Sequence, residues 1–260
     1  DLLKGTAIGI VLGLPLLFVV LWLMERAGPL WWLYTWIVWV AFNLFVQFIF
    51  PHVIAPMFNK FEPLADASLA QRIEGLMKRC GFAARGLFVM DGSKRSAHGN
   101  AYFSGFGRAK RIVFFDTLIE RLSPAEIEAV LAHELGHFKR RHITKRLVVA
   151  FALSLAFLAL LGWLAGRTWF YTELGVMPSM TGSNNALALV LFFLVLPVFG
   201  FFASPLSSLT SRKHEFEADA FAASQTQASD LINALVKLYQ DNASTLTPDP
   251  VYTAFYYSHP

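Results

Sequence analysis

Four long runs without a charged residue constrain this chain most, because one soluble core rarely needs so many. Each run supplies the roughly 20 apolar residues that cross about 30 Å of hydrocarbon. Hydrophobic residues make up 55% of the chain and charged residues only 15%, whereas soluble domains average about 25% charged residues. We therefore predict four membrane spans, within residues 5–24, 27–59 (centred on 31–50), 147–166 and 174–211 (centred on 186–203).

Lysine and arginine indicate the orientation of these spans. Residues 51–146 hold 16 of the 22 basic residues, while the loops 25–30 and 167–173 hold one arginine each. The positive-inside rule then places both chain ends and the middle region in the cytoplasm. The basic run at 139–146 is suited to contact anionic lipid headgroups. We expect a lipid bilayer as partner and no nucleic acid.

The middle region has its own fold signals. Residues 67–80 have helical spacing and end at Gly81, which is typical of a helix C-terminus. Residues 86–91 and 111–119 are rich in β-branched and aromatic side chains and are predicted to be strands, with a short strand between them at 100–103. We therefore predict a mainly α integral membrane protein, a multi-span helical bundle whose middle region is an α+β fold that contains a small β-sheet.

This reading divides the chain into four parts. They are two membrane helices (1–59), the cytoplasmic middle region (60–146), two further membrane helices (147–204), and a C-terminal part (205–260). The single cysteine, Cys80, excludes an internal disulfide. Because the chain starts without a methionine, we expect it to be part of a longer protein.

A metal-binding pattern lies on a helix that the sequence predicts independently. Ser123 and Glu126 form a capping box with Pro124 in the first helical position, so a helix should begin there. Further along it, the sequence HELGH places His133 and His137 four residues apart on one face, where both can bind one zinc ion. Glu134 follows His133 directly, so its side chain is offset from the ligand face of the helix and is suited to act as general base on a water molecule. Residues 60–146 are therefore predicted to be a zincin-like α+β metalloprotease region.

The third ligand is expected in the acidic segment 211–224. Glu215 and Asp219 share a helix face, and Glu217 points nearly opposite. We interpret Glu215 as the ligand and Asp219 as a carboxylate that orients a ligand histidine, although spacing alone favours Glu215 over Glu217 only weakly. Glu217 and His214 are assigned solvated or structural roles. His142, off the ligand face, is interpreted as a histidine at the membrane interface.

Four motifs in this order resemble the type 1 CAAX prenyl proteases, which are integral-membrane zinc endopeptidases. They are HGNAYFSGFGRAKRIVFFDTLI, VLAHELGHF, EFEADAFA and YYSHP, and the resemblance runs from about residue 50 to residue 260. It implies one zinc ion on His133, His137 and Glu215, with Glu134 as base and Asp219 beside the ligands. It also implies that His259 stabilises the oxyanion, and that a strand at Asn100, Ala101 and Tyr102 contacts the substrate.

The resemblance also implies seven membrane helices around a water-filled chamber, with the site on the cytoplasmic side. The expected substrate is a peptide or protein, in some family members lipidated, because eukaryotic members remove the last three residues of prenylated CaaX proteins. The alanine- and arginine-rich composition suggests a bacterial inner-membrane protein; in a eukaryote, the membrane would be that of the endoplasmic reticulum.

Other functions fit parts of the pattern. An HtpX-type protease would use the same chemistry on damaged membrane proteins, but the NAYFSGF stretch and the terminal YSHP favour the prenyl-protease group. A site-2-type protease would place HELGH within an apolar span, whereas this helix carries Glu126, Glu128 and Lys139. A non-catalytic zinc-bound sensor would have no need for Glu134.

Overall fold

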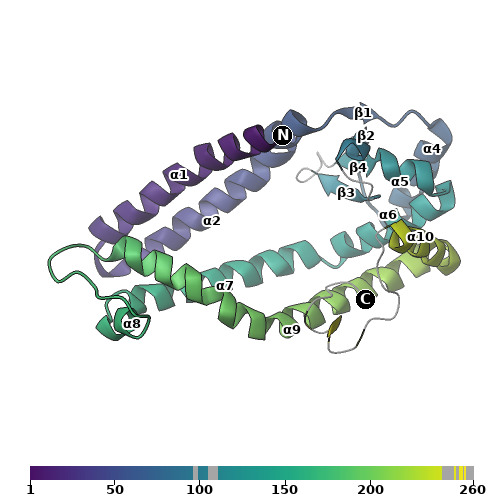
Figure 1. The fold of residues 1–260 in the computed structure, drawn as a ribbon. Helices are drawn as coiled ribbons and strands as arrows, with labels where there is room; N and C mark the ends of the chain where they lie inside the picture. The colour runs from purple at the N-terminus through teal and green to yellow at the C-terminus, as the bar shows by residue number, and fades with distance from the viewer. Residues whose placement is uncertain (96–98, 105–110, 242–248, 250–251, 254, 256–260) are drawn as a thin grey trace. The chain divides into compact units, whose positions relative to one another are not determined.

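The computed structural model describes residues 1–95, 99–104, 111–241, 249, 252–253 and 255 (Figure 1). The chain divides into two compact units. The first comprises residues 1–47 and 145–203, and the second comprises residues 48–144 and 204–260. The site that the sequence predicts falls entirely within the second unit.

Within the described residues, four helices are long and apolar enough to cross a membrane. They are α1 (Leu2–Arg26), the continuous helical stretch Gly28–Phe58, α7 (His142–Leu164) and α9 (Asn185–Gln225). The second stretch contains η1 (Gly28–Leu30), α2 (Trp31–Ile49), a π-helical turn η2 (Phe50–Ile54) and α3 (Ala55–Phe58). The centre of each predicted run therefore lies in a helix, but residues 174–184 of the fourth run precede α9 and are not helical.

Many apolar side chains on these helices are exposed, among them Phe18 of α1, Val148 of α7 and Phe193 of α9, as expected for surfaces that face lipid. Within the first unit, a small buried cluster includes Trp31 from α2, Leu161 from α7 and Phe192 from α9. The short helix α8 (Thr168–Thr172) adds Phe170 and Tyr171 to it. Away from this cluster, the membrane rather than the protein would cover the apolar surface.

The second unit contains a four-stranded sheet in the order β1-β2-β4-β3. Strand β2 (Leu87–Met90) pairs with β1 (Phe61–Pro63) in antiparallel and with β4 (Arg111–Phe115) in parallel fashion. Strand β3 (Ala101–Ser104) pairs with β4 in antiparallel fashion, with Tyr102 opposite Val113. Among the described strands, β3 thus lies at one edge of the sheet.

The prediction of a strand over 111–119 was wrong in its second half. The strand ends at Phe115, and α5 (Asp116–Arg121) follows directly. The Asp116 carboxylate accepts hydrogen bonds from the backbone N–H groups of Ser93 and Thr117. Ser93 lies in the short turn η3 (Gly92–Lys94). These bonds satisfy donors at the helix start and favour helix over strand at this position. Strand β1, which contains only three residues, was not predicted.

The predicted end of α4 and the predicted start of α6 are both found in the structure. Helix α4 (Ala67–Cys80) is capped by the Asp66 side chain and ends at Gly81, whose φ of 67° is left-handed. Helix α6 (Pro124–Lys139) begins with the predicted capping box, in which Ser123 and Glu126 satisfy each other's backbone N–H groups.

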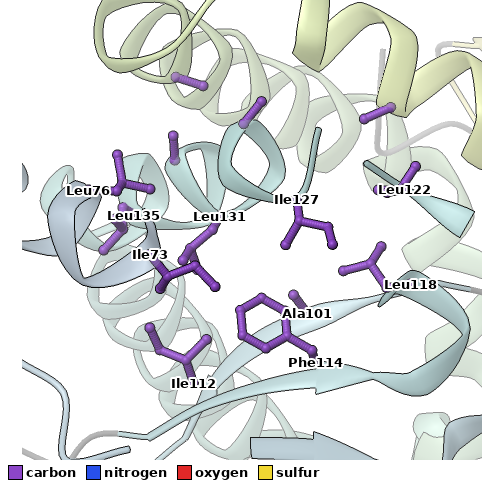
Figure 2. Close-up of a cluster of buried hydrophobic side chains, with 14 of the residues drawn as sticks. Ile73, Leu76, Ala101, Ile112, Phe114, Leu118, Leu122, Ile127, Leu131 and Leu135 are labelled. Carbon is purple, nitrogen blue, oxygen red and sulfur yellow. The ribbon is translucent and has the colours of Figure 1, made fainter. Parts of the chain in front are cut away.

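The core of the second unit lies between α6 and the sheet. Figure 2 shows Ile127, Leu131 and Leu135 of α6 facing Ile112 and Phe114 of β4, all at most 2% exposed. Helix α4 contributes Ile73 and Leu76 to the same cluster. Burying a side chain of this size stabilises a fold by about 1.5–3 kcal/mol. This packing fixes α6 on the sheet and so fixes the residues that α6 carries.

Helix α9 joins an apolar stretch to the acidic segment without a break. The segment 205–225, expected to begin a separate part of the chain, continues the helix that contains the fourth apolar run (α9, green in Figure 1). Helix α10 (Ala228–Asp241) follows and packs against α6, where the Lys237 ammonium lies 2.7 Å from the Glu126 carboxylate.

Candidate metal centre

Helices α6 and α9 cross closely at Gly136. A Cβ atom on Gly136 would lie 2.9 Å from the Cα of Ala218, which is fully buried on α9. His133 and His137 flank Gly136, and Glu215 and Asp219 lie on either side of Ala218. The sequence analysis did not single out Gly136, yet the missing side chain lets the two sets of polar residues meet.

Three of the predicted ligand atoms converge at this crossing. The Nε2 atoms of His133 and His137 lie 3.0 Å apart, and Glu215 Oε2 lies 3.4 Å from each. Donors bound to one zinc ion at 2.0–2.1 Å and tetrahedral angles lie roughly 3.3 Å apart. The donor set therefore fits a metal ion, and Glu215, only 3% exposed, contributes a buried negative charge.

Asp219 holds the outer nitrogen of His133, as the sequence predicted. Its Oδ1 atom lies 2.8 Å from His133 Nδ1. Burial by itself lowers the pKa of His133, but the hydrogen bonds to the carboxylates of Asp219 and Glu215 outweigh it and raise the pKa to about 9. Two carboxylates thus draw positive charge to this ring. A metal cation placed between the ligand atoms would satisfy the same preference.

The sequence interpretation of His142 as a histidine at the membrane interface missed its contact with a predicted metal ligand. His142 is 1% exposed, and its Nδ1 atom lies 3.0 Å from His137 Nδ1. Its Nε2 atom lies 3.0 Å from Glu217 Oε2, and the ring of His214 stacks on it at 4.1 Å. Arg141 adopts a left-handed φ of 57° between α6 and α7, and the turn there returns His142 towards α6. Helical spacing within α6 could not predict this.

The predicted substrate strand lies beside the metal-binding helix. Strand β3 contacts α6, and Phe103 of β3 joins Phe138, the residue after His137, in an aromatic cluster with Phe82. Exposed Asn100 precedes the strand, and its Oδ1 accepts a hydrogen bond from the Ala101 N–H. His259 lies outside the described residues.

Taken together, a helix with HELGH, a glutamate from a second helix and an edge strand beside the first define a metallopeptidase of the zincin type. The chain belongs to peptidase family M48, whose family model matches residues 63–260. Residues 1–60 match the model described as "CAAX prenyl protease N-terminal, five membrane helices".

Two curated relatives and one crystal structure are similar along the whole chain. The CAAX prenyl protease 1 homolog of Arabidopsis thaliana is 40% identical and CAAX prenyl protease 1 of Saccharomyces cerevisiae is 36% identical, each over 100% of this chain. The crystal structure of S. mikatae Ste24p is 34% identical and superposes with a TM-score of 0.91, again over 100% of this chain.

The chain spans about three fifths of the length of these proteins: 61% and 60% of the two relatives and 63% of the crystallised chain. The two relatives are eukaryotic, so they do not support the bacterial origin that the composition suggested.

Proposed function

We propose that this chain carries the catalytic site of a membrane-embedded zinc endopeptidase that acts as CAAX prenyl proteases do. The observation that carries the proposal is the convergence of His133, His137 and Glu215 within 4.8 Å, with Glu134 on the same helix as the two histidines. A purely structural metal site would need no such glutamate. The HELGH helix is not among the candidate spans, which disfavours an intramembrane site-2-type protease.

One zinc ion held by these three residues would polarise the scissile carbonyl and lower the pKa of a water molecule to about 7. Glu134 would accept the proton of the attacking water and then transfer it to the leaving amine. Asp219 would hold His133 in the tautomer that keeps its Nε2 lone pair directed to the metal. His259, carried over from the family motif, would donate a hydrogen bond to the developing oxyanion.

The substrate would bind as an added strand along β3. The strand pairs with β4 on one side, and no other described strand pairs with its second edge, which would be the edge that an extended peptide joins. Main-chain hydrogen bonds give affinity with little side-chain selectivity in this mode of binding, and Asn100, Ala101 and Tyr102 are the proposed contacts. The proposed substrates are CaaX-type or other membrane-associated peptides, with or without a lipid.

The proposed location is a multi-span membrane with the site on its cytoplasmic face. The 16 basic residues between positions 51 and 146, including the run from Lys139 to Arg146, support this orientation. The eukaryotic relatives favour the endoplasmic reticulum over the bacterial inner membrane as the compartment.

The test uses the full-length protein with prenylated and unprenylated CaaX peptides, and mass spectrometry to map the cuts. We expect cleavage near the peptide C-terminus by the parent, and none by Glu134→Gln even though this variant keeps its zinc, because base catalysis is lost while the ligands remain. Near-normal turnover by Glu134→Gln would overturn the mechanism. A parent that binds no metal would overturn the proposed function.

A further inference from the structure

Three polar residues of the second unit take no part in the proposed mechanism. His142, Glu217 and His214 lie next to the metal centre, and the sequence analysis assigned them no role there. We propose that His142 and Glu217 are positioning residues that hold the ligand His137 through a two-step hydrogen-bonded bridge. This inference rests on the proposed function, because it assumes that His137 binds a metal ion.

The bridge has a defined direction. An ionised carboxylate can only accept hydrogen bonds, so the hydrogen in the 3.0 Å contact between His142 Nε2 and Glu217 Oε2 belongs to the histidine. A neutral His142 then has its lone pair on Nδ1, and His137 Nδ1 donates to it across 3.0 Å. The lone pair of His137 is thereby left on Nε2, the atom that faces His133 and Glu215.

The alternative protonation state is incompatible with metal binding. If His137 Nδ1 instead accepted a hydrogen bond from His142 Nδ1, a neutral His137 would carry its hydrogen on Nε2, where a ligand needs a lone pair. The Glu217 carboxylate therefore fixes the tautomer of His142, and His142 in turn fixes the tautomer of His137. Removing it would release both rings to rotate or to exchange tautomers, although the residues that bind the ion would be unchanged.

The two ligand histidines are held by different means. His133 reaches the Asp219 carboxylate directly at 2.8 Å. His137 lies one turn further along α6 and reaches Glu217 only through the ring of His142. His214, itself 7% exposed, stacks on that ring with an interplanar angle of 15° and so fixes its plane. Residues of this kind typically contribute 10–100-fold to metal affinity.

The side chain of Glu217 is 30% exposed, whereas His142 is almost fully buried. The bridge thus runs from the metal centre to the protein surface. This difference matters for the test, because a substitution at partly exposed Glu217 leaves the core packing intact. The bridge can therefore be broken at its outer end without a cavity.

The experiment measures zinc affinity of the full-length protein by competition with a chelator, and the visible absorption of the Co²⁺-substituted protein. The variants are Glu217→Gln, His142→Phe and the double variant. Phenylalanine keeps a flat ring to stack on His214 but forms neither hydrogen bond. Asp219→Asn serves as the positive control, and Glu74→Gln, at an exposed position of α4, as the negative control.

We expect His142→Phe to weaken zinc binding by about 10–100-fold and to change the Co²⁺ spectrum. Glu217→Gln should weaken binding less, because the amide oxygen still accepts a neutral hydrogen bond. Adding Glu217→Gln to His142→Phe should cost nothing further, since Glu217 acts through His142. If His142→Phe does not fold, Glu217→Gln against Glu74→Gln decides the question.

Two results would overturn the inference while leaving the proposed function intact. One is parental zinc affinity and a parental Co²⁺ spectrum in Glu217→Gln and in any folded His142→Phe protein. The other is full additivity of the two substitutions, which would show that Glu217 does not act through His142. Failure of the parent to bind zinc would instead overturn the proposed function.

Discussion

Gly136 of the HELGH helix lies directly against the backbone of Ala218 on α9. A Cβ at Gly136 would approach the Ala218 Cα to 2.9 Å and its carbonyl oxygen to 3.1 Å, and backbone atoms cannot rotate aside as a side chain can. The close approach of these two residues sets the spacing between the ligands of α6 and the ligand of α9.

Gly136→Ala should therefore separate the helices and weaken the metal site. Overpacking of this kind typically costs about 1–3 kcal/mol, and we expect a lower melting temperature together with reduced zinc content. Gly75→Ala on α4 is the matched control, because its Cβ would meet only the end of the Arg79 side chain at 3.7 Å. That control should be neutral or should stabilise the protein by about 0.5–1 kcal/mol. Equal zinc content and stability in the two variants would contradict the crossing argument.

The ligand assignment predicts about one zinc ion per purified full-length chain. His133→Ala and Glu215→Ala should lose most of it, because each leaves only two protein ligands. Metal analysis after dialysis provides the measurement, and Glu74→Ala provides the control. Full retention of zinc in Glu215→Ala, with complete loss in Glu217→Ala, would exchange the roles of these two glutamates.

The oxyanion and substrate assignments predict different kinetic changes. His259→Ala should lower kcat by about 10²–10³-fold with zinc content unchanged, since one hydrogen-bond donor to the transition state is lost. Asn100→Ala should mainly raise KM, because the strand that holds the peptide is altered while the chemistry is not. Steady-state kinetics on a CaaX peptide separates the two. A His259→Ala protein that cleaves at the parental rate would remove His259 from the mechanism.

Glu126 makes stability depend on pH. Burial by itself raises the pKa of Glu126, but hydrogen bonds from Lys237 and from the Ser123 N–H outweigh it and hold the pKa below its ordinary value of 4.5. A lowered folded-state pKa stabilises the protein above pH 4.5, and this stabilisation is lost as the pH falls through the folded-state pKa. Glu126→Gln should thus unfold more easily than the parent at pH 7, by about 1 kcal/mol.

The difference should shrink as the pH falls below 4.5, because the parent then loses the same charge. Thermal unfolding of the detergent-solubilised proteins at several pH values measures it. Glu120→Gln on the exposed side of α5 serves as control and should follow the parent at every pH. A gap between Glu126→Gln and the parent that persists unchanged into acid would show that the carboxylate charge is not its cause.

The orientation can be tested with single cysteines in a Cys80→Ser background. Glu74→Cys lies at an exposed position of α4. Met180→Cys lies in the loop before α9, where Met180 is 93% exposed. In bacteria that express the protein in the inner membrane, an impermeant thiol reagent should label position 180 in intact cells. Position 74 should react only after permeabilisation. The reverse pattern would invert the topology.

Local rules predicted much of this fold. The left-handed Gly81 and the capping box at Ser123 each depend on a few neighbouring residues, so the end of α4 and the start of α6 could be placed from sequence. The strand over 111–119 was extended too far because the apolar residues after Phe115 continue the pattern. Only the bonds between Asp116 and Ser93, more than twenty residues earlier, explain why the chain changes to a helix there.

The metal centre, like the fold, was predicted only in part. His133, His137 and Glu215 follow from helical spacing and from the family motifs, and the structure brings them together. His142 and Glu217 could not be found this way, because their contact depends on the turn at Arg141 and on the crossing of two helices. Neither the turn nor the crossing is encoded in a spacing along α6.

One ion shared by His137 and Glu215 would also restrict how many times the chain between these two residues crosses the bilayer. Residues that bind the same ion lie on the same side of the bilayer, so the segment between them must cross it an even number of times. Two candidate spans, α7 and the apolar part of α9, occupy that segment. A chain with only one of them inserted would leave the glutamate and the histidines on opposite sides. Proteolytic activity would therefore arise only after both crossings are complete, which protects the cell from a half-inserted protease.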